Sequence, residues 1–97
     1  MLEIQKSKKA RSDLKDIWKY SFDQWGESRA DSYYDKLEKA MNQIALTPKM
    51  GKPKEAIRMG LRGYHAGRHV IYYKIHTTHI LVLRVLHDRS DPYLYED

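Results

Sequence analysis

Polar side chains able to do acid–base chemistry close the most apolar segment of the chain. Residues 80–86 hold six apolar side chains and one arginine, Arg84, and the run His87-Asp88-Arg89 follows at once. So apolar a run is typical of a buried strand, which must be covered on both faces and would deliver these groups to one end of a sheet. An imidazole could act as general acid or base in RNA cleavage while nearby cations stabilise the charged transition state. The residues that offer this chemistry are His87, Arg84, Arg62, Arg68, Lys52 and Lys54, and the first four are the candidate set for a metal-free ribonuclease.

Each member of that set also has a plainer interpretation. Arg62 and Arg68 could be solvated strand residues, and His87 could simply end a strand. Arg84 could be held by an acidic partner, because a charge inside an apolar run needs one. Spacing alone leaves both interpretations open.

Other catalytic or metal sites find little support. The chain has no cysteine, so thiolate chemistry and disulfides are excluded. Ser90 lies near His87 and Asp91 only in sequence, whereas a catalytic triad depends on geometry in space. The five histidines (65, 69, 76, 79 and 87) form two close pairs, but no carboxylate or cysteine completes a metal-binding set. There is no glycine-rich phosphate loop, and we expect neither a metal nor a cofactor.

Charge is distributed unevenly along the 97 residues. The formal net charge is +5. Residues 1–48 are nearly balanced, with nine Lys or Arg against eight Asp or Glu, whereas residues 49–89 hold nine Lys or Arg against two acids, a balance of +7. A field of one sign suits an acidic protein or a nucleic acid as partner. No apolar run is long enough to span a bilayer and no signal peptide begins the chain, so we expect no membrane contact.

Two helices are predicted in the first half of the chain, after a short alternating strand at residues 2–5. Ser7 can cap the first helix, whose stripe of Ala10, Leu14 and Ile17 is widened by Trp18, Phe22 and Trp25. Gly26 is expected to end it, and Ser28 with Asp31 resembles a capping box for the second helix, which ends near Pro48. So short a connection predicts an antiparallel hairpin, and both stripes need a sheet to cover them.

Three strands are predicted after a basic loop that spans residues 48–60. They cover residues 61–66, 68–76 and 79–86, with a reversal at residues 77–78. The order β-α-α-β-β-β segregates the helices from the strands. It predicts one α+β domain over residues 1–97, with a helical hairpin packed on a small antiparallel sheet.

Several segments together carry a family resemblance that covers nearly the whole chain. They are Ala10-Arg-Ser-Asp-Leu-Lys-Asp-Ile-Trp18, Tyr20, Trp25-Gly26, Ala30, Tyr33, Leu37, Pro48, Gly51, Arg68-His-Val-Ile-Tyr-Tyr73 and Leu83-Arg-Val-Leu-His-Asp-Arg89. On these residues the chain resembles the ParE branch of the RelE/ParE toxin superfamily, the toxin halves of bacterial toxin–antitoxin modules. It departs from the family pattern at Ser90, where an apolar residue is common.

The resemblance implies the same βααβββ fold and a cytoplasmic bacterial toxin. It implies a cognate antitoxin whose disordered tail folds around the toxin in a hetero-oligomer. ParE-type toxins are described as inhibitors of DNA gyrase, which implies inhibition by binding and no catalytic residues. RelE-type relatives share the fold but cut messenger RNA on the ribosome, and this endoribonuclease activity is the alternative.

Two sets of binding residues follow from the resemblance together with charge and shape. An antitoxin segment would lie on the helical hairpin and pair its acidic side chains with arginines, which gives the set Trp18, Trp25, Tyr33, Arg58, Arg62, Arg68 and Arg84. Either the same basic surface or the C-terminal segment would contact the target, and the segment gives the set Arg89, Tyr93 and Tyr95.

Overall fold

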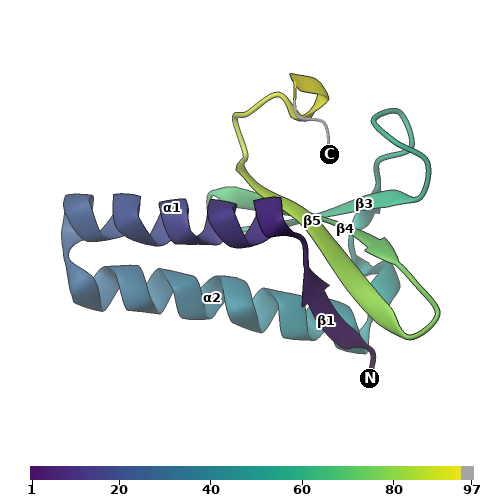
Figure 1. Cartoon of the computed structure of the whole chain (residues 1–97), viewed down its shortest axis with the longest axis horizontal. Helices are drawn as coiled ribbons and strands as arrows, with labels where there is room; N and C mark the ends of the chain where they lie inside the picture. The colour runs from purple at the N-terminus through teal and green to yellow at the C-terminus, as the bar shows by residue number, and fades with distance from the viewer. Residues whose placement is uncertain (95–97) are drawn as a thin grey trace.

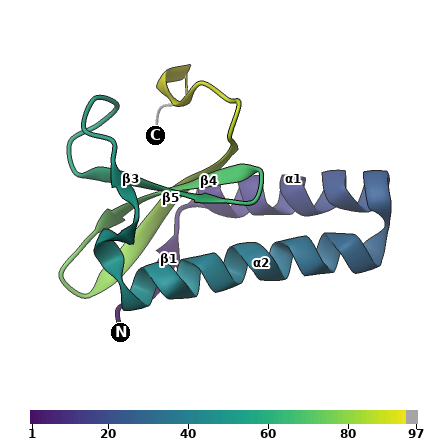
Figure 2. The ribbon, with the colours of Figure 1, turned by 180° about the vertical axis from the view of Figure 1, so that it is seen from behind.

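Two antiparallel helices pack on one face of a five-stranded sheet in the computed structural model, which describes residues 1–94 (Figures 1 and 2). The predicted α+β fold with a helical hairpin is confirmed. The elements are β1 (Glu3–Lys6), α1 (Lys8–Trp25), α2 (Glu27–Leu46), β2 (Lys52–Pro53), β3 (Leu61–Ala66), β4 (His69–Ile75) and β5 (His79–His87), with single 3₁₀ turns at Pro48–Met50 and Pro92–Leu94.

The sheet has the order β1-β5-β4-β3-β2 and is mixed, not wholly antiparallel as predicted. β1 pairs with β5 in parallel, while the other neighbours are antiparallel. The reason lies in the helical hairpin, which returns the chain to the start of β1, where Leu2 N–H donates to Ala45 O at 3.2 Å. β3 therefore runs in the direction of β1, and two reversals give β5 that direction as well. The two-residue strand β2 forms inside the predicted basic loop.

The main core lies between the helices and the inner face of the sheet. Its buried members are Ala10, Leu14, Leu37, Met41, Ile44, Ala66, Ile71, Tyr73, Ile80, Val82 and Val85. Ser7 fixes the start of α1, because its Oγ accepts from Ala10 N–H at 3.0 Å and donates to Leu83 O at 2.8 Å. Gly26 ends α1 with a φ of 88° and directly precedes α2, so Ser28 lies inside that helix and caps nothing.

The hairpin projects beyond the sheet, as both views of the ribbon show (Figures 1 and 2). Only Ala10, Leu14 and Ser21 of α1 are buried. Phe22 and Trp25, predicted to widen the core-facing stripe, are exposed because no strand reaches that end of the hairpin. None of the helices in residues 1–94 has the length and apolar character that crossing a membrane requires.

The outer face of the sheet is covered only in part. A small second cluster of Leu61, Tyr72 and Leu86 is buried there, with Ile57 from the connection between β2 and β3 packed against it. Leu81 and Leu83 of β5 remain partly exposed. The prediction that β5 is covered on both faces therefore holds fully for its inner face alone.

Candidate functional site

Arg84 is held in place by an aspartate of α1. Asp13 accepts from Arg84 Nε at 2.8 Å and from Arg84 Nη2 at 2.9 Å. It also accepts from Val85 N–H at 3.0 Å, on the part of β5 that extends beyond β1. The two side chains are only 17% and 13% exposed. Arg84 therefore closes a sheet edge, which agrees with the plainer interpretation of this residue.

Arg62, near the start of β3, is held by backbone carbonyls of the segment before β2. Its Nε donates to Gly51 O and its Nη2 donates to Lys49 O, both at 3.0 Å. In the sheet, Arg62 of β3 lies opposite Tyr73 of β4. His87 of β5 lies opposite His69 of β4, which is four residues from Tyr73 along that strand. Four residues of strand span roughly 13 Å. The structure therefore does not bring Arg62 and His87 together.

A polar group, here called the strand-end cluster, consists of Tyr33, His65, His69, His87 and Asp88. Tyr33 Oη accepts from Arg68 N–H at 3.0 Å and lies 2.5 Å from His69 Nδ1. The hydroxyl proton is thus available to a neutral imidazole. Burial raises the pKa of Tyr33. Burial and the nearby His87 lower the pKa of His69, which keeps that imidazole neutral.

The exposed half of this cluster is tied to the backbone and to one carboxylate. His87 Nδ1 accepts from Arg89 N–H at 3.1 Å and lies 3.3 Å from Asp88 Oδ1. His65 Nε2 lies 3.1 Å from Asp88 Oδ2. Among residues 1–94, no three His, Cys, Asp or Glu side chains are grouped so as to hold a metal ion. Of the three candidate arginines, Arg68 lies beside this cluster, since its N–H donates to Tyr33 and its carbonyl oxygen accepts from Asp88 N–H. Arg62 and Arg84 are held elsewhere, by the backbone near Gly51 and by Asp13.

The projecting half of α1 carries an aromatic surface, defined by Trp18, Tyr20, Phe22 and Trp25. Trp18 stacks on Phe22 with ring centroids 5.2 Å apart, and Tyr20 meets Trp25 edge-on at 6.1 Å. Tyr20, Phe22 and Trp25 are 61%, 44% and 56% exposed. Trp18 and Trp25 belong to the predicted antitoxin-binding set, whereas Tyr20 and Phe22 do not. Tyr33 lies elsewhere, in the strand-end cluster.

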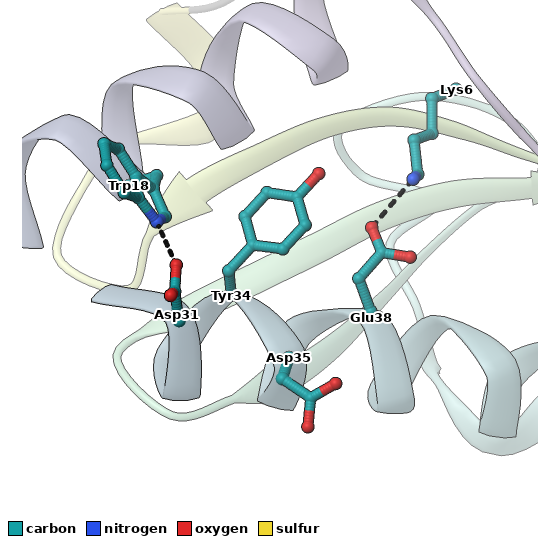
Figure 3. A pocket seen from close by; sticks show the side chains of 6 residues that line it. All are labelled: Lys6, Trp18, Asp31, Tyr34, Asp35 and Glu38. Carbon is teal, nitrogen blue, oxygen red and sulfur yellow. Dashed lines mark hydrogen bonds and ion pairs between the residues drawn. The ribbon is translucent and has the colours of Figure 1, made fainter. Parts of the chain in front are cut away.

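A hollow of about 690 Å³ lies beside this aromatic surface, between α1, α2 and β1. Trp18 Nε1 donates to Asp31 at 2.9 Å, and Lys6 pairs with Glu38 at 2.8 Å. Figure 3 shows the Tyr34 ring between these two interactions, while Asp35 points away from them. This hollow is not among the sites predicted from the sequence. The signal was the spacing of Asp31, Asp35 and Glu38, which places three acids along one side of α2.

The remaining predicted residues lie at the outer side of the sheet or in its connections. Arg58 and Arg84 line a small hollow there together with Pro92. Arg68 is exposed in the turn between β3 and β4, and Tyr93 is exposed near the C-terminus. Arg89 lines a larger hollow with Lys52 and Lys54. Tyr95 lies outside the described residues.

Comparison with known proteins shows which family this chain is similar to. Residues 4–92 match the family model of the ParE toxin of the type II toxin–antitoxin system parDE. The chain is 40% identical over 81 residues to Toxin ParE1 of Caulobacter vibrioides, covering 84% of this chain and 83% of that protein. It is 35% identical over 83 residues to Toxin ParE1 of Mycobacterium tuberculosis, covering 84% and 85%.

A solved structure supports the fold. It is described as a chromosomal ParDE toxin–antitoxin system from P. aeruginosa, with a TM-score of 0.78 at 16% identity over 90% of this chain and 96% of that chain. The topology agrees with the family match, and the match extends over nearly all the described elements. The chain therefore belongs to the ParE toxin family of type II toxin–antitoxin systems.

Proposed function

We propose that the protein is a cytoplasmic toxin that inhibits DNA gyrase by binding and is neutralised by a cognate antitoxin. The observation that supports binding over catalysis is the division of the candidate catalytic set. Arg68 lies at the same end of β4 as His87, but Arg84 is held by Asp13, and Arg62 is held by two backbone carbonyls near the other end of β4. Catalysis of RNA cleavage needs an acid–base group and cations within reach of one phosphate.

The aromatic surface of the hairpin supports the proposed antitoxin contact. Three aromatic side chains are exposed on one projecting helix, and exposed apolar patches commonly mark interaction sites. An amphipathic helix of the antitoxin laid on this surface would bury them, at roughly 1.5–3 kcal/mol for each ring fully covered. Arg68 remains exposed for an acidic antitoxin side chain, whereas Arg62 and Arg84 already serve the fold.

A paired assay tests the proposed target. Purified protein is added to gyrase with relaxed plasmid, and in parallel to translating ribosomes. We expect loss of supercoiling and accumulation of cleaved DNA, with the messenger RNA intact. Conversely, ribosome-dependent cleavage of messenger RNA with normal supercoiling would establish the endoribonuclease alternative and dispose of the gyrase proposal.

A single substitution separates the two mechanisms further. His87→Ala removes an exposed imidazole whose polar contacts are with Asp88 and Arg89, close by in sequence, and whose ring meets His69 edge-on, so the fold should survive. A binding toxin should retain most of its effect on gyrase. Abolition of that effect, with the melting temperature and antitoxin binding unchanged, would contradict inhibition by binding alone.

The antitoxin contact has its own test. Trp25→Ser removes an exposed ring from the aromatic surface, and Lys19→Ser on the same helix serves as the matched control. Calorimetric titration with the cognate antitoxin should show weaker binding for Trp25→Ser and near-normal binding for the control. Equal affinity of both variants would place the antitoxin elsewhere.

A further inference from the structure

The outer face of the sheet carries a basic hollow of about 570 Å³, here called the outer hollow. It is lined by Met50, Lys52, Lys54, Gly63, Tyr64, His65, Val70, Asp88 and Arg89. Gly63 leaves room in the lining for a neighbouring side chain, because a Cβ at this position would lie 3.1 Å from Lys54 Cε and 3.2 Å from Val70 Cγ1. The missing side chain lets the stem of Lys54 lie across the sheet beside the hollow.

The cations of the outer hollow are available to a ligand. Within residues 1–94, the side chains of Lys52, Lys54 and Arg89 have no acidic partner. The one carboxylate in the hollow, Asp88, lies within 3.3 Å of both His65 and His87. Three cations in an open hollow, with the nearby acid already engaged, form a site for a chain of negative charge.

We propose that the outer hollow binds backbone phosphates of duplex DNA, so that the toxin touches the DNA that gyrase holds. This inference extends the proposed function and rests on it, because gyrase is the proposed target that brings the toxin to DNA. Duplex DNA carries a negative charge about every 1.7 Å along its axis, so a few cations in one open hollow engage it without a tailored cage. Two of the three cations are lysines, which bind phosphates as point charges, and the third is Arg89, whose guanidinium can hold two phosphate oxygens at once.

The charged residues of the lining favour DNA over a folded peptide segment. A docked amphipathic helix needs an apolar groove, whereas Lys52, Lys54, His65, Asp88 and Arg89 stand beside Met50, Tyr64 and Val70 in the outer hollow. The aromatic surface that suits such a helix lies on the projecting hairpin, away from this face. An acidic peptide is therefore included in the experiment as the competing ligand.

Two variants of equal net charge test the assignment. The first is K52Q/K54Q/R89Q, and the control K15Q/K19Q/K36Q removes three exposed lysines from the helices. Binding of a short fluorescein-labelled DNA duplex is followed by fluorescence anisotropy over a series of salt concentrations, with a polyglutamate peptide as the second probe. Melting temperatures check that both variants are folded.

The expected result is local. The hollow variant should lose roughly tenfold or more in affinity for the duplex at low salt, and the slope of log K against log salt should fall by about 2.7 for three lost phosphate contacts. The control variant should lose much less. Equal losses in the two variants, or tighter binding of polyglutamate than of DNA by the unmodified protein, would overturn the assignment.

Adding gyrase to the same series separates this inference from the proposed function. If the unmodified protein binds duplex DNA through the outer hollow but leaves supercoiling untouched, the gyrase proposal fails and the DNA site stands. If it inhibits gyrase while both variants bind DNA alike, the DNA site fails and the gyrase proposal stands.

Discussion

Removing the Asp13 carboxylate should destabilise the protein severely, because this one group serves two strand residues. In Asp13→Ala the guanidinium of Arg84 loses both of its contacts to the carboxylate, at 2.8 and 2.9 Å, and Val85 N–H loses its acceptor at 3.0 Å. The change also leaves a positive charge, only 17% exposed, without its carboxylate. The damage thus falls on β5, which lies between β1 and β4 in the sheet.

The size of the effect can be worked out from burial. Removing one partner of a fully buried ion pair costs roughly 3–5 kcal/mol. Residual exposure of 17% and 13% lets water screen part of that loss, so about 3 kcal/mol, at the lower end, is expected. An unfolding entropy of about 2.1 cal/mol/K per residue then gives a drop in Tm of about 15 °C for a chain of this length.

Thermal unfolding followed by circular dichroism measures the drop, with Asp16→Ala on the exposed side of the same helix as the control. The double variant D13A/R84M should be less unstable than the two single changes added together, because it removes the stranded charge. A Tm for Asp13→Ala within about 3 °C of the control would refute the reasoning, since a few degrees is the scale of ordinary surface substitutions. Such a result would mean that the Asp13–Arg84 pair contributes little to stability.

Three further changes probe the packing around the sheet. Tyr73→Phe should cost about 1–3 kcal/mol in urea unfolding, because the Tyr73 hydroxyl donates to Pro48 O and accepts from Gly51 N–H, which a phenyl ring leaves unpaired; no loss would mean that water replaces it. Gly67→Ala should lower stability by at least about 1 kcal/mol, because Gly67 has a φ of 61° and a Cβ there would lie 2.8 Å from a tyrosine ring of α2, whereas Ala at an exposed helical position should be neutral. His69 should make unfolding pH-dependent: its pKa is lowered in the fold, so the unfolded chain binds the proton first, and stability should fall as pH drops below about 6.5, a trend that His69→Gln should flatten.

The order of elements was predictable because each leaves a local pattern. The stripe of α1, the capping Ser7 and the apolar run of β5 set bounds close to those observed. The parallel pairing of β1 could not be read locally, since it depends on where the hairpin returns the chain. The exposure of Phe22 and Trp25 was misjudged for a related reason. Periodicity identifies a helix face but not how far the sheet beneath it extends.

The candidate site was predictable in its residue types but not in its grouping. The arginine inside an apolar run was correctly suspected of having an acidic partner, but the partner, Asp13, lies 71 residues away in the chain. His69 and His87 lie together near Tyr33 because the register pairs them across β4 and β5, whereas His65 is opposite Val70 and joins the cluster through Asp88. That register depends on a bulge between Tyr72 and Tyr73, which the sequence pattern does not reveal.

The two candidate surfaces differ in chemistry and lie on different layers of the molecule. The hairpin offers aromatic rings next to a hollow lined by Asp31 and Glu38, whereas the outer hollow offers lysines and an arginine. They lie apart, since the aromatic surface is on the projecting end of α1, whereas the outer hollow is lined by residues of β2, β3 and β4 and of the segments next to them. One bound partner therefore need not compete directly with the other for the same atoms. Under the proposed function, an antitoxin on the hairpin would neutralise the toxin in one of two ways. It would block the approach to gyrase sterically, or it would extend round the sheet to the outer hollow. The acidic side chains of such an extension would pair with the cations that otherwise face DNA.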